Sequence, residues 1–360
     1  MKPFALSCLA VALLSSPFLA SAQALPDGPA PAAMVSSYTD AQANLAIAAE
    51  SEGWARQLSA SQPLSVSLSG LPTLLPGHQS SDVLTLRTAL EERGFLERPA
   101  ALAPDGSVPD LTLYDQGVED AVRAAQRSYG IAEDGKAGQQ VYLNLSGTDA
   151  ALASDLQQWG SELRWHAEQA RLAGFRKMII VNIPSYTLKA VDLETGETLL
   201  ETRVIVGKAS RRTPLFKTNV VNLKYNPDWT PPPSLAKQGK RYVPAGPNNP
   251  LGRVRFSTDN NQNIYLHHTN EPDLFNRSSR ALSSGCVRVE RWDDLAALLD
   301  QSDLEHVHSR VATKKTVFDK VEPVQVIMTY SLVDVTSGRP ARFPDVYGAG
   351  ARATAPAHLK

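Results

Sequence analysis

The spacing of hydrophobic residues changes once along this chain, near residue 176. Upstream, apolar residues such as Val83, Leu86 and Leu90 recur every three or four positions, which is the spacing of a helix with one buried face. Downstream, the run Met178–Ile183 is apolar at almost every position, which is typical of a buried strand. Because the two patterns bury different kinds of surface, we expect separate helical and strand-rich domains in an α+β multidomain protein.

Three short helices are expected in a small domain over residues 80–147. Gly94 and Gly130 end the first two helices, since glycine readily takes the left-handed conformation that closes a helix. A longer helical connector is expected over 148–175. The three predicted helices are 82–96, 114–130 and 141–145, with a polar loop at 97–113 between the first two.

The strand-rich domain is expected over residues 176–348, with a tail of small and polar residues at 349–360. Its short strands are separated by turn residues such as those of Glu194–Glu197, as in mainly-β domains. A proline-rich, irregular excursion interrupts the strands at 226–250. The clearest predicted elements are strands at 178–183, 186–191, 199–206 and 324–332, and one helix at 291–300.

The N-terminus has the features of a secretory signal peptide. Lys2 supplies a positive charge, an apolar run follows, and small residues precede two cleavage positions, near Ala22 or Ala24. The apolar run is shorter than the roughly 20 residues that span a membrane, so no anchor is expected after processing. Residues 1–22 are therefore predicted to direct export to the periplasm or cell envelope. Residues 23–79 are predicted to be a flexible or weakly helical segment and linker.

Charge and cysteine content narrow the function. The 36 basic and 37 acidic residues nearly cancel, so the chain has no excess positive charge for nucleic-acid binding. The two cysteines are Cys8 and Cys286, and signal cleavage removes Cys8. In an oxidising compartment, the remaining cysteine is a partner for another chain, an inert buried residue or a protected nucleophile.

One constellation favours the nucleophile. A predicted strand at 264–269 places Tyr265 and His267 on one face, and Cys286 follows downstream on a tight turn made by Gly285. The turn precedes a helix and a cation, Arg288, which favours a thiolate, and a nearby imidazole can accept the thiol proton. The N–H groups of Gly285 and Cys286 are predicted to hold an oxyanion, and Arg288 to bind a carboxylate.

Each part of this constellation also has a simpler interpretation. A lone cysteine is often a packing residue, and a His-His pair is often exposed or, more rarely, binds a metal. A metal would need further ligands, and the neighbouring histidines, His306 and His308, lack a closed ligand spacing. We therefore expect no metal and no organic cofactor.

Taken together, the motifs resemble the active-site signature of the L,D-transpeptidases of bacterial cell walls. The resemblance covers about residues 176–348 and is similar to the larger periplasmic branch. It depends on six stretches: Tyr265–Thr269 (YLHHT), Ser279–Val289 (SRALSSGCVRV), Val181–Pro184 (VNIP), Val204–Lys208 (VIVGK), Arg212–Pro214 (RTP) and Asn226–Trp229 (NPDW).

The resemblance implies a role for each residue of the signature. Cys286 would be the nucleophile and His267 the base, with its ring oriented by the backbone carbonyl of His268. Arg288 would position the donor stem. Many members have a histidine at the position of Ser284, and many have Gly, Ser or Asp at the position of His268. The cap that the large branch inserts near 226–250 is much shorter here. The remaining residues assigned to the substrate are Ser284 and Tyr265.

Residues 80–147 resemble the small three-helix peptidoglycan-binding domain. The matching positions are Leu86-Arg87, Leu90, Gly94, Tyr114-Asp115, Ala121-Val122, Gln126, Gly130-Ile131, Asp134-Gly135, Gly138 and Leu143-Asn144. Ala125 stands where an aromatic residue is usual, and the loop at 97–113 is long. A helical spacer without a ligand remains the alternative.

The two resemblances imply an exported cell-wall enzyme that is acylated by carbapenems. It would form 3→3 peptidoglycan cross-links through a cysteine thioester, releasing D-alanine from tetrapeptide stems. Its partners would be donor and acceptor stem peptides and other cell-wall enzymes, with no nucleic acid. Hydrolysis of the same thioester, as in an L,D-carboxypeptidase, or attachment of a wall protein are alternatives. A non-catalytic peptidoglycan-binding scaffold with an inert Cys286 is the alternative of a different class.

Overall fold

The computed structural model describes residues 45–58, 63–98, 108–147, 149–260 and 263–349. The predicted signal peptide and almost all of the predicted C-terminal tail lie outside these ranges. Among the described helices, none is both long and apolar enough to cross a membrane.

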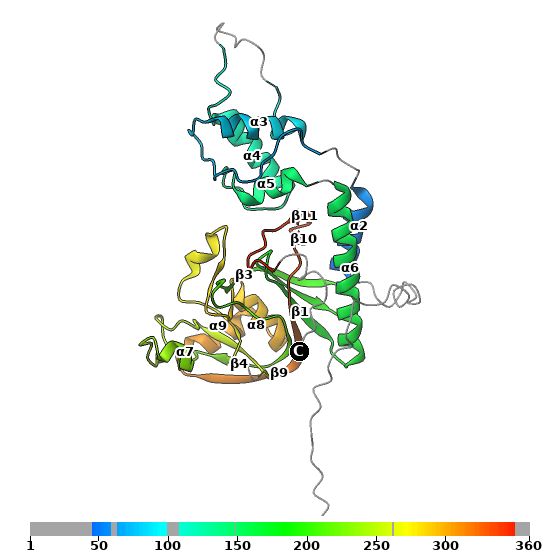
Figure 1. Ribbon diagram of the computed structural model, residues 1–360. Helices are drawn as coiled ribbons and strands as arrows, with labels where there is room; N and C mark the ends of the chain where they lie inside the picture. The colour runs from blue at the N-terminus through cyan, green and yellow to red at the C-terminus, as the bar shows by residue number, and fades with distance from the viewer. Residues whose placement is uncertain (1–44, 59–62, 99–107, 148, 261–262, 350–360) are drawn as a thin grey trace, which may run out of the picture.

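The three predicted helices of the N-terminal domain are confirmed (Figure 1). They are α3 (Ser81–Glu92), α4 (Gln116–Ser128) and α5 (Gln139–Ser146). Asp115 caps α4 by accepting a hydrogen bond from the N–H of Val118, at 3.0 Å. The apolar face of each helix supplies one small core, which includes Leu86, Leu90, Tyr114, Val118, Val122 and Leu145.

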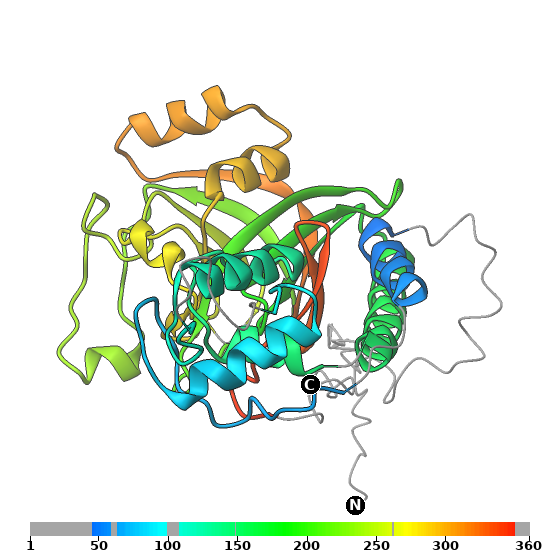
Figure 2. The same ribbon diagram turned by 90° about the horizontal axis from the view of Figure 1, so that it is seen from above.

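The predicted connector is a packed element rather than a linker. It forms α6 (Asp149–Leu172), which lies beside α2 (Ala46–Gln57) along one side of the molecule (Figures 1 and 2). Trp159 and Leu163 of α6 are buried together with Met178 and Ile180 of the first strand. Burial of this apolar stripe fixes the helix against the sheet.

The strand-rich domain is one nine-stranded sheet with the order β2-β1-β9-β4-β5-β6-β8-β3-β7. Strand β3 also pairs with β2, so eight of the strands form a closed ring. The strands are β1 (Lys177–Asn182), β2 (Thr187–Asp192), β3 (Thr198–Gly207), β4 (Lys217–Tyr225), β5 (Val254–Thr258), β6 (Leu266–His267), β7 (Ala281–Ser283), β8 (Val287–Val289) and β9 (Val317–Thr329).

The helix predicted after the cysteine is confirmed as α8 (Trp292–Asp300), but it is followed by a second helix, α9 (Leu304–Ala312). Asp303 begins α9 by accepting a hydrogen bond from the N–H of His306, at 2.7 Å. The expectation of a single helix here was wrong because α9 is short and buries only Val307 fully. The excursion and its neighbouring loop contain two more short helices, α7 (Pro233–Ala236) and the 3-10 helix η1 (Pro272–Asn276).

A hairpin near the C-terminus joins the two domains. Its strands, β10 (Val333–Thr336) and β11 (Arg339–Arg342), form a separate two-stranded sheet that lies between α5 and the large sheet, next to α6 (Figure 1). The side chain of Asn144 in α5 donates to the carbonyl of Arg342 at 3.0 Å and accepts from its N–H at 2.8 Å. Thr336 donates to the carbonyl of Gly130 at 3.2 Å.

Candidate active site

Three neighbouring strands place the predicted site residues on one face. His267 of β6 lies opposite Arg288 of β8 on one side and Arg255 of β5 on the other. Residues directly opposite in a sheet project to the same face, so two guanidinium groups flank the imidazole. Cys286 lies on the turn just before β8, and it lines the same groove as these three residues.

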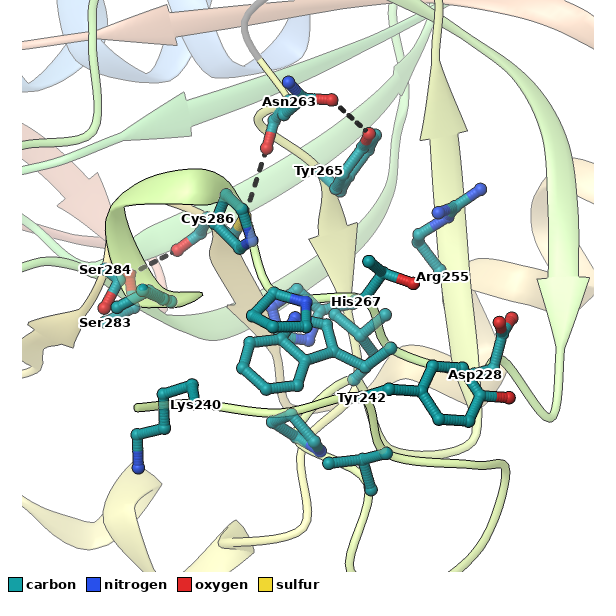
Figure 3. A pocket seen from close by; sticks show the side chains of 18 of the residues that line it. Asp228, Lys240, Tyr242, Arg255, Asn263, Tyr265, His267, Ser283, Ser284 and Cys286 are labelled. Atoms are coloured by element: carbon teal, nitrogen blue, oxygen red, sulfur yellow. Dashed lines mark hydrogen bonds between the residues drawn. The ribbon is translucent and has the colours of Figure 1, made fainter. Parts of the chain in front are cut away.

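The groove has a volume of about 1070 Å³, and the excursion forms one of its walls. Tyr242 and Lys240 of the excursion lie across the groove from Cys286 (Figure 3). The predicted substrate residues Ser284, Tyr265 and Arg288 also line it. The excursion, although much shorter than the cap of the large branch, therefore still forms part of the groove wall.

The Cys286 thiol is half-buried and neutral. Its Sγ lies 3.7 Å from the carbonyl oxygen of Asn263, to which it donates (Figure 3). Burial raises the pKa of the thiol above its ordinary value of 9.0, although the backbone N–H of Tyr265 and the cations of Arg288 and Arg255 oppose this shift. The sequence predicted a thiolate, and this prediction is corrected to a protonated thiol. Strand β8 separates the turn from the start of α8, and the effect of burial on the thiol pKa is larger than that of the nearby cations.

His267 is buried, with 5% of its surface exposed, and its ring is fixed by the main chain. Nδ1 lies in short contact with the carbonyl oxygen of His268. A carbonyl accepts, so Nδ1 carries the proton and Nε2 holds a lone pair. Burial, followed by the charge of Arg288, lowers the pKa of His267 to about 3. The imidazole is therefore neutral at pH 7 and is able to accept a proton at Nε2.

The side chain of His268 packs behind the groove. Its Nδ1 accepts a hydrogen bond from the N–H of Arg253 at 3.1 Å, and its ring centroid lies 4.9 Å from that of Trp292. Burial, followed by the charge of Arg253, lowers the pKa of His268 to about 4. Neighbouring residues of an extended chain point to opposite sides, so His267 faces the groove and His268 packs against Trp292.

The turn that carries the nucleophile, Ser283–Cys286, is stabilised by the side chain of Ser283. Its Oγ accepts from the N–H of Gly285 at 3.1 Å and donates to the carbonyl of Cys286 at 2.5 Å. The N–H of Gly285, which we expected to bind an oxyanion, is therefore already engaged. Within the part of the chain that the structure describes, the N–H of Cys286 has no hydrogen-bond partner, and it remains as a donor.

Arg288 is partly engaged. Its Nη1 donates to Glu271 at 2.8 Å and to the hydroxyl of Thr269 at 3.2 Å. Tyr265 donates to the side chain of Asn263 at 3.0 Å, and the guanidinium of Arg255 lies 4.7 Å from the centre of its ring. Neither Arg255 nor Asn263 belongs to a sequence motif, and only strand pairing brings Arg255 beside His267.

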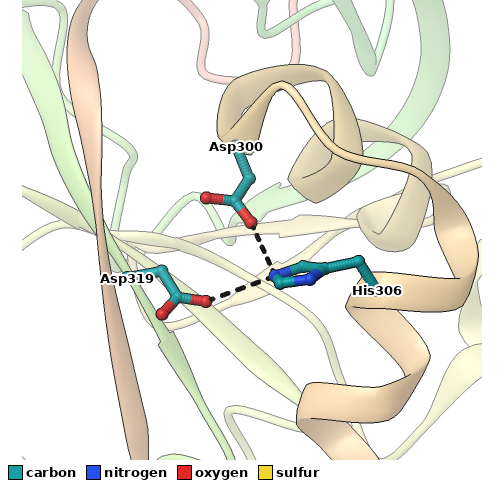
Figure 4. A group of neighbouring side chains, drawn as sticks. All are labelled: Asp300, His306 and Asp319. Carbon is teal, nitrogen blue, oxygen red and sulfur yellow. Dashed lines mark ion pairs between the residues drawn. The ribbon is translucent and has the colours of Figure 1, made fainter.

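A separate cluster contains residues that are able to ligate a metal. Where α8, α9 and β9 meet, Nε2 of His306 lies 3.2 Å from Asp300 and 3.8 Å from Asp319 (Figure 4). Arg310 donates to the other oxygen of Asp319 at 2.7 Å, so the cluster already contains a counter-charge. None of these residues lines the groove. The sequence spacing did not predict this grouping, since the three residues lie on separate elements, α8, α9 and β9, that meet only in the fold.

Family comparisons match both halves of the chain. Residues 176–326 match the family described as "L,D-transpeptidase catalytic domain", and residues 79–143 match the one described as "Putative peptidoglycan binding domain". Both matches lie where the two resemblances were placed.

Individual relatives agree with these matches. A protein of Haemophilus influenzae named "Putative L,D-transpeptidase" is 31% identical over 52% of this chain and 47% of its own length. "Probable L,D-transpeptidase ErfK/SrfK" of Escherichia coli is 34% identical over 35% of this chain and 41% of its own length. This chain thus spans less than half the length of either relative. A solved "L,D-transpeptidase from Mycobacterium smegmatis" aligns at 13% identity, with a TM-score of 0.26, over 43% of this chain and 58% of that one.

Proposed function

We propose that the protein forms 3→3 cross-links between peptidoglycan stem peptides, since residues 176–326 match the family described as "L,D-transpeptidase catalytic domain". The observation that carries the proposal is that a cysteine thiol and an oriented neutral imidazole line the same groove. Residues 79–143, which match the peptidoglycan-binding family, would hold the catalytic domain against its polymeric substrate. The predicted signal sequence and this domain support action in the cell envelope.

In the first step, Nε2 of His267 accepts the proton of Cys286 as Sγ attacks the donor carbonyl. That carbonyl joins the L-centre of diaminopimelate to the terminal D-alanine of a tetrapeptide stem. The N–H of Cys286 stabilises the oxyanion that forms. The C–N bond then breaks, the amine of D-alanine takes the proton from Nε2, and a thioester remains on Sγ.

In the second step, the side-chain amine of a neighbouring stem attacks the thioester. The amine gives a proton to Nε2, the C–S bond breaks, and the proton returns to Sγ. The products are a new amide, which is the 3→3 cross-link, and the free enzyme. Because the imidazole is neutral before each step, it is able to act as the base both times.

The test of the reaction is muropeptide analysis after the purified protein has been incubated with tetrapeptide-rich sacculi. We expect 3→3 dimers together with free D-alanine, and neither product with Cys286→Ser. Tripeptides without dimers would assign hydrolysis in place of cross-linking. Absence of any product, together with no imipenem adduct on Cys286, would leave the non-catalytic scaffold as the better description.

His267→Ala is expected to slow dimer formation by about 10²- to 10⁴-fold, because a positioned general base contributes about that much. The matched control is His308→Ala, which removes an imidazole whose side chain is 56% exposed and lies outside the groove. Initial rates of D-alanine release measure both variants. An equal loss in the two variants would contradict the assignment of His267 as the base.

A further inference from the structure

Thr213 lies directly behind the nucleophile turn and is 2% exposed. Its Oγ1 donates to the carbonyl of Gly285 at 2.8 Å and accepts from the N–H of Gly207 at 2.8 Å. One buried hydroxyl thus ties the residue before the nucleophile to the end of strand β3. The contact joins segments that are far apart in the sequence.

Tyr347 supports Thr213 from the C-terminal segment. Its hydroxyl accepts from the N–H of Thr213 at 3.0 Å and donates to the carbonyl of Gly207 at 2.7 Å. The ring of Tyr347 is stacked on that of Tyr330, with centroids 5.5 Å apart, and the hydroxyl of Tyr330 accepts from the N–H of Tyr347 at 2.6 Å. The hydroxyl groups of Thr213 and Tyr347 are therefore fixed in position and in direction.

Gly207 allows this close packing. A Cβ atom at Gly207 would lie 2.2 Å from the carbonyl oxygen of Arg211 and 2.6 Å from the N–H nitrogen of Thr213, both of which are backbone atoms. The main chains of β3 and the loop before Thr213 approach one another directly. The hydroxyl of Thr213 therefore has little freedom to leave Gly285.

The direction of one peptide group follows from these bonds. A trans peptide is planar, with its C=O and N–H pointing to opposite sides. Since the carbonyl of Gly285 points to Thr213, the N–H of Cys286 points away from it. Gly285 has φ of +119°, and a residue without Cβ would otherwise rotate readily to other conformations.

We propose that Thr213 and Tyr347 are positioning residues that orient the Gly285–Cys286 peptide so that the N–H of Cys286 faces the reacting carbonyl. Both act through the carbonyl of Gly285 and do not touch the substrate. The inference rests on the proposed acyl transfer, in which that N–H holds the oxyanion. Ser283 binds the N–H of Gly285 and the carbonyl of Cys286, and Thr213 binds the carbonyl of Gly285.

The experiment compares two reactions of the same thiol. Acylation of Cys286 by imipenem passes through an oxyanion, whereas alkylation by iodoacetamide is a displacement at carbon that forms none. Thr213→Val removes the hydroxyl and keeps the branched shape, and Thr213→Ser keeps the hydroxyl. Tyr347→Phe removes only the second hydroxyl. Rates of both reactions are measured from pH 6 to pH 10 on the full chain.

We expect Thr213→Val to slow imipenem acylation by about 10- to 100-fold, since loss of one oxyanion donor typically costs about 10²- to 10³-fold. Iodoacetamide alkylation and its pH midpoint should stay unchanged. Thr213→Ser should restore acylation, and Tyr347→Phe should give a smaller loss in acylation alone. If Thr213→Val does not fold, the Tyr347→Phe comparison provides the same test.

Equal losses in both reactions would overturn the positioning role and indicate a purely structural one. Unchanged acylation in Thr213→Val, or in Tyr347→Phe if only that variant folds, would also overturn it. Neither result would affect the proposed function, which the unsubstituted protein tests. If the unsubstituted protein forms no imipenem adduct and no cross-links, the acyl transfer and the positioning role are overturned together.

Discussion

Cys286 and His267 are shifted in ways that both favour the neutral form. Burial raises the pKa of the thiol and lowers that of the imidazole to about 3. A buried ion pair would have to repay the loss of hydration of both charges. The pair is therefore a thiol and a neutral base before substrate binds, and the proton moves only as the S–C bond forms.

This state predicts a particular pH dependence of thiol alkylation. With the thiol pKa above 9.0, the thiolate fraction at pH 7 is small and rises about tenfold per pH unit. The iodoacetamide rate should therefore climb steadily from pH 6 to pH 9, as measured by mass spectrometry of Cys286. N-acetylcysteine provides the reference curve, and its midpoint should lie below that of the protein. A plateau that begins near pH 5 would contradict the neutral pair and indicate a thiolate–imidazolium pair.

At the scale of elements, the excursion between β4 and β5 forms a wall of the groove because its base is clamped. Asn249 is fully buried, and its Nδ2 donates to the carbonyls of Pro227, Val243 and Pro244 at 2.9 to 3.1 Å. Its Oδ1 accepts from the N–H of Leu251 at 2.9 Å. The side-chain amide of Asn249 thus connects the start, the middle and the end of the excursion by hydrogen bonds.

Asn249→Ala should loosen the excursion, because the buried carbonyl of Pro227 and the buried N–H of Leu251 lose their partner, at a cost of about 1–3 kcal/mol each. The side chains of Lys237, Lys240 and Arg241 are already exposed, and local opening lets the backbone beside them enter the active site of trypsin, so cleavage there should become at least about tenfold faster. Peptide mapping over a time course measures the effect. Asn248→Ala, which changes the exposed neighbouring asparagine, is the control. Equal cleavage rates in the two variants would show that Asn249 does not clamp the excursion.

At the scale of the whole molecule, the β10–β11 hairpin connects the peptidoglycan-binding-like domain, helix α6 and the catalytic sheet. Asp334 of β10 is 3% exposed and lies 3.2 Å from Nζ of Lys189 in β2. The indole of Trp159 in α6 donates to the same carboxylate at 3.3 Å. Asn144 of α5 binds the other strand of the hairpin. The hairpin thus links both domains by directional bonds.

Asn144→Ala should weaken the contact between the N-terminal domain and the hairpin, since it removes both bonds to the backbone of Arg342 and leaves the bond from Thr336 to Gly130. Hydrogen exchange at the amide of Arg342 should become about tenfold faster or more, in line with the loss of one buried bond. Imipenem acylation at Cys286 should not change, because the groove lies elsewhere. Ser146→Ala, on the exposed side of α5, is the control. Unchanged exchange would show that other contacts hold the domains together.

The sequence by itself determined the elements whose burial follows a local period. The helices of the N-terminal domain, α6 and the first three strands each carry their own apolar face, and they form close to the predicted positions. The cysteine and histidine of the groove were also identified before the fold, by their motifs. In both cases the information lies within a few neighbouring residues.

Only the tertiary structure decided the closure of the sheet, the β10–β11 hairpin and the environment of the thiol. Strand β3 pairs with three other strands, and Arg255, Thr213 and Tyr347 reach the site only through such distant pairings. The sequence indicated a thiolate from nearby cations, whereas burial keeps the thiol protonated. Desolvation and hydrogen bonding depend on neighbours brought from far along the chain, and no local pattern of residues records them.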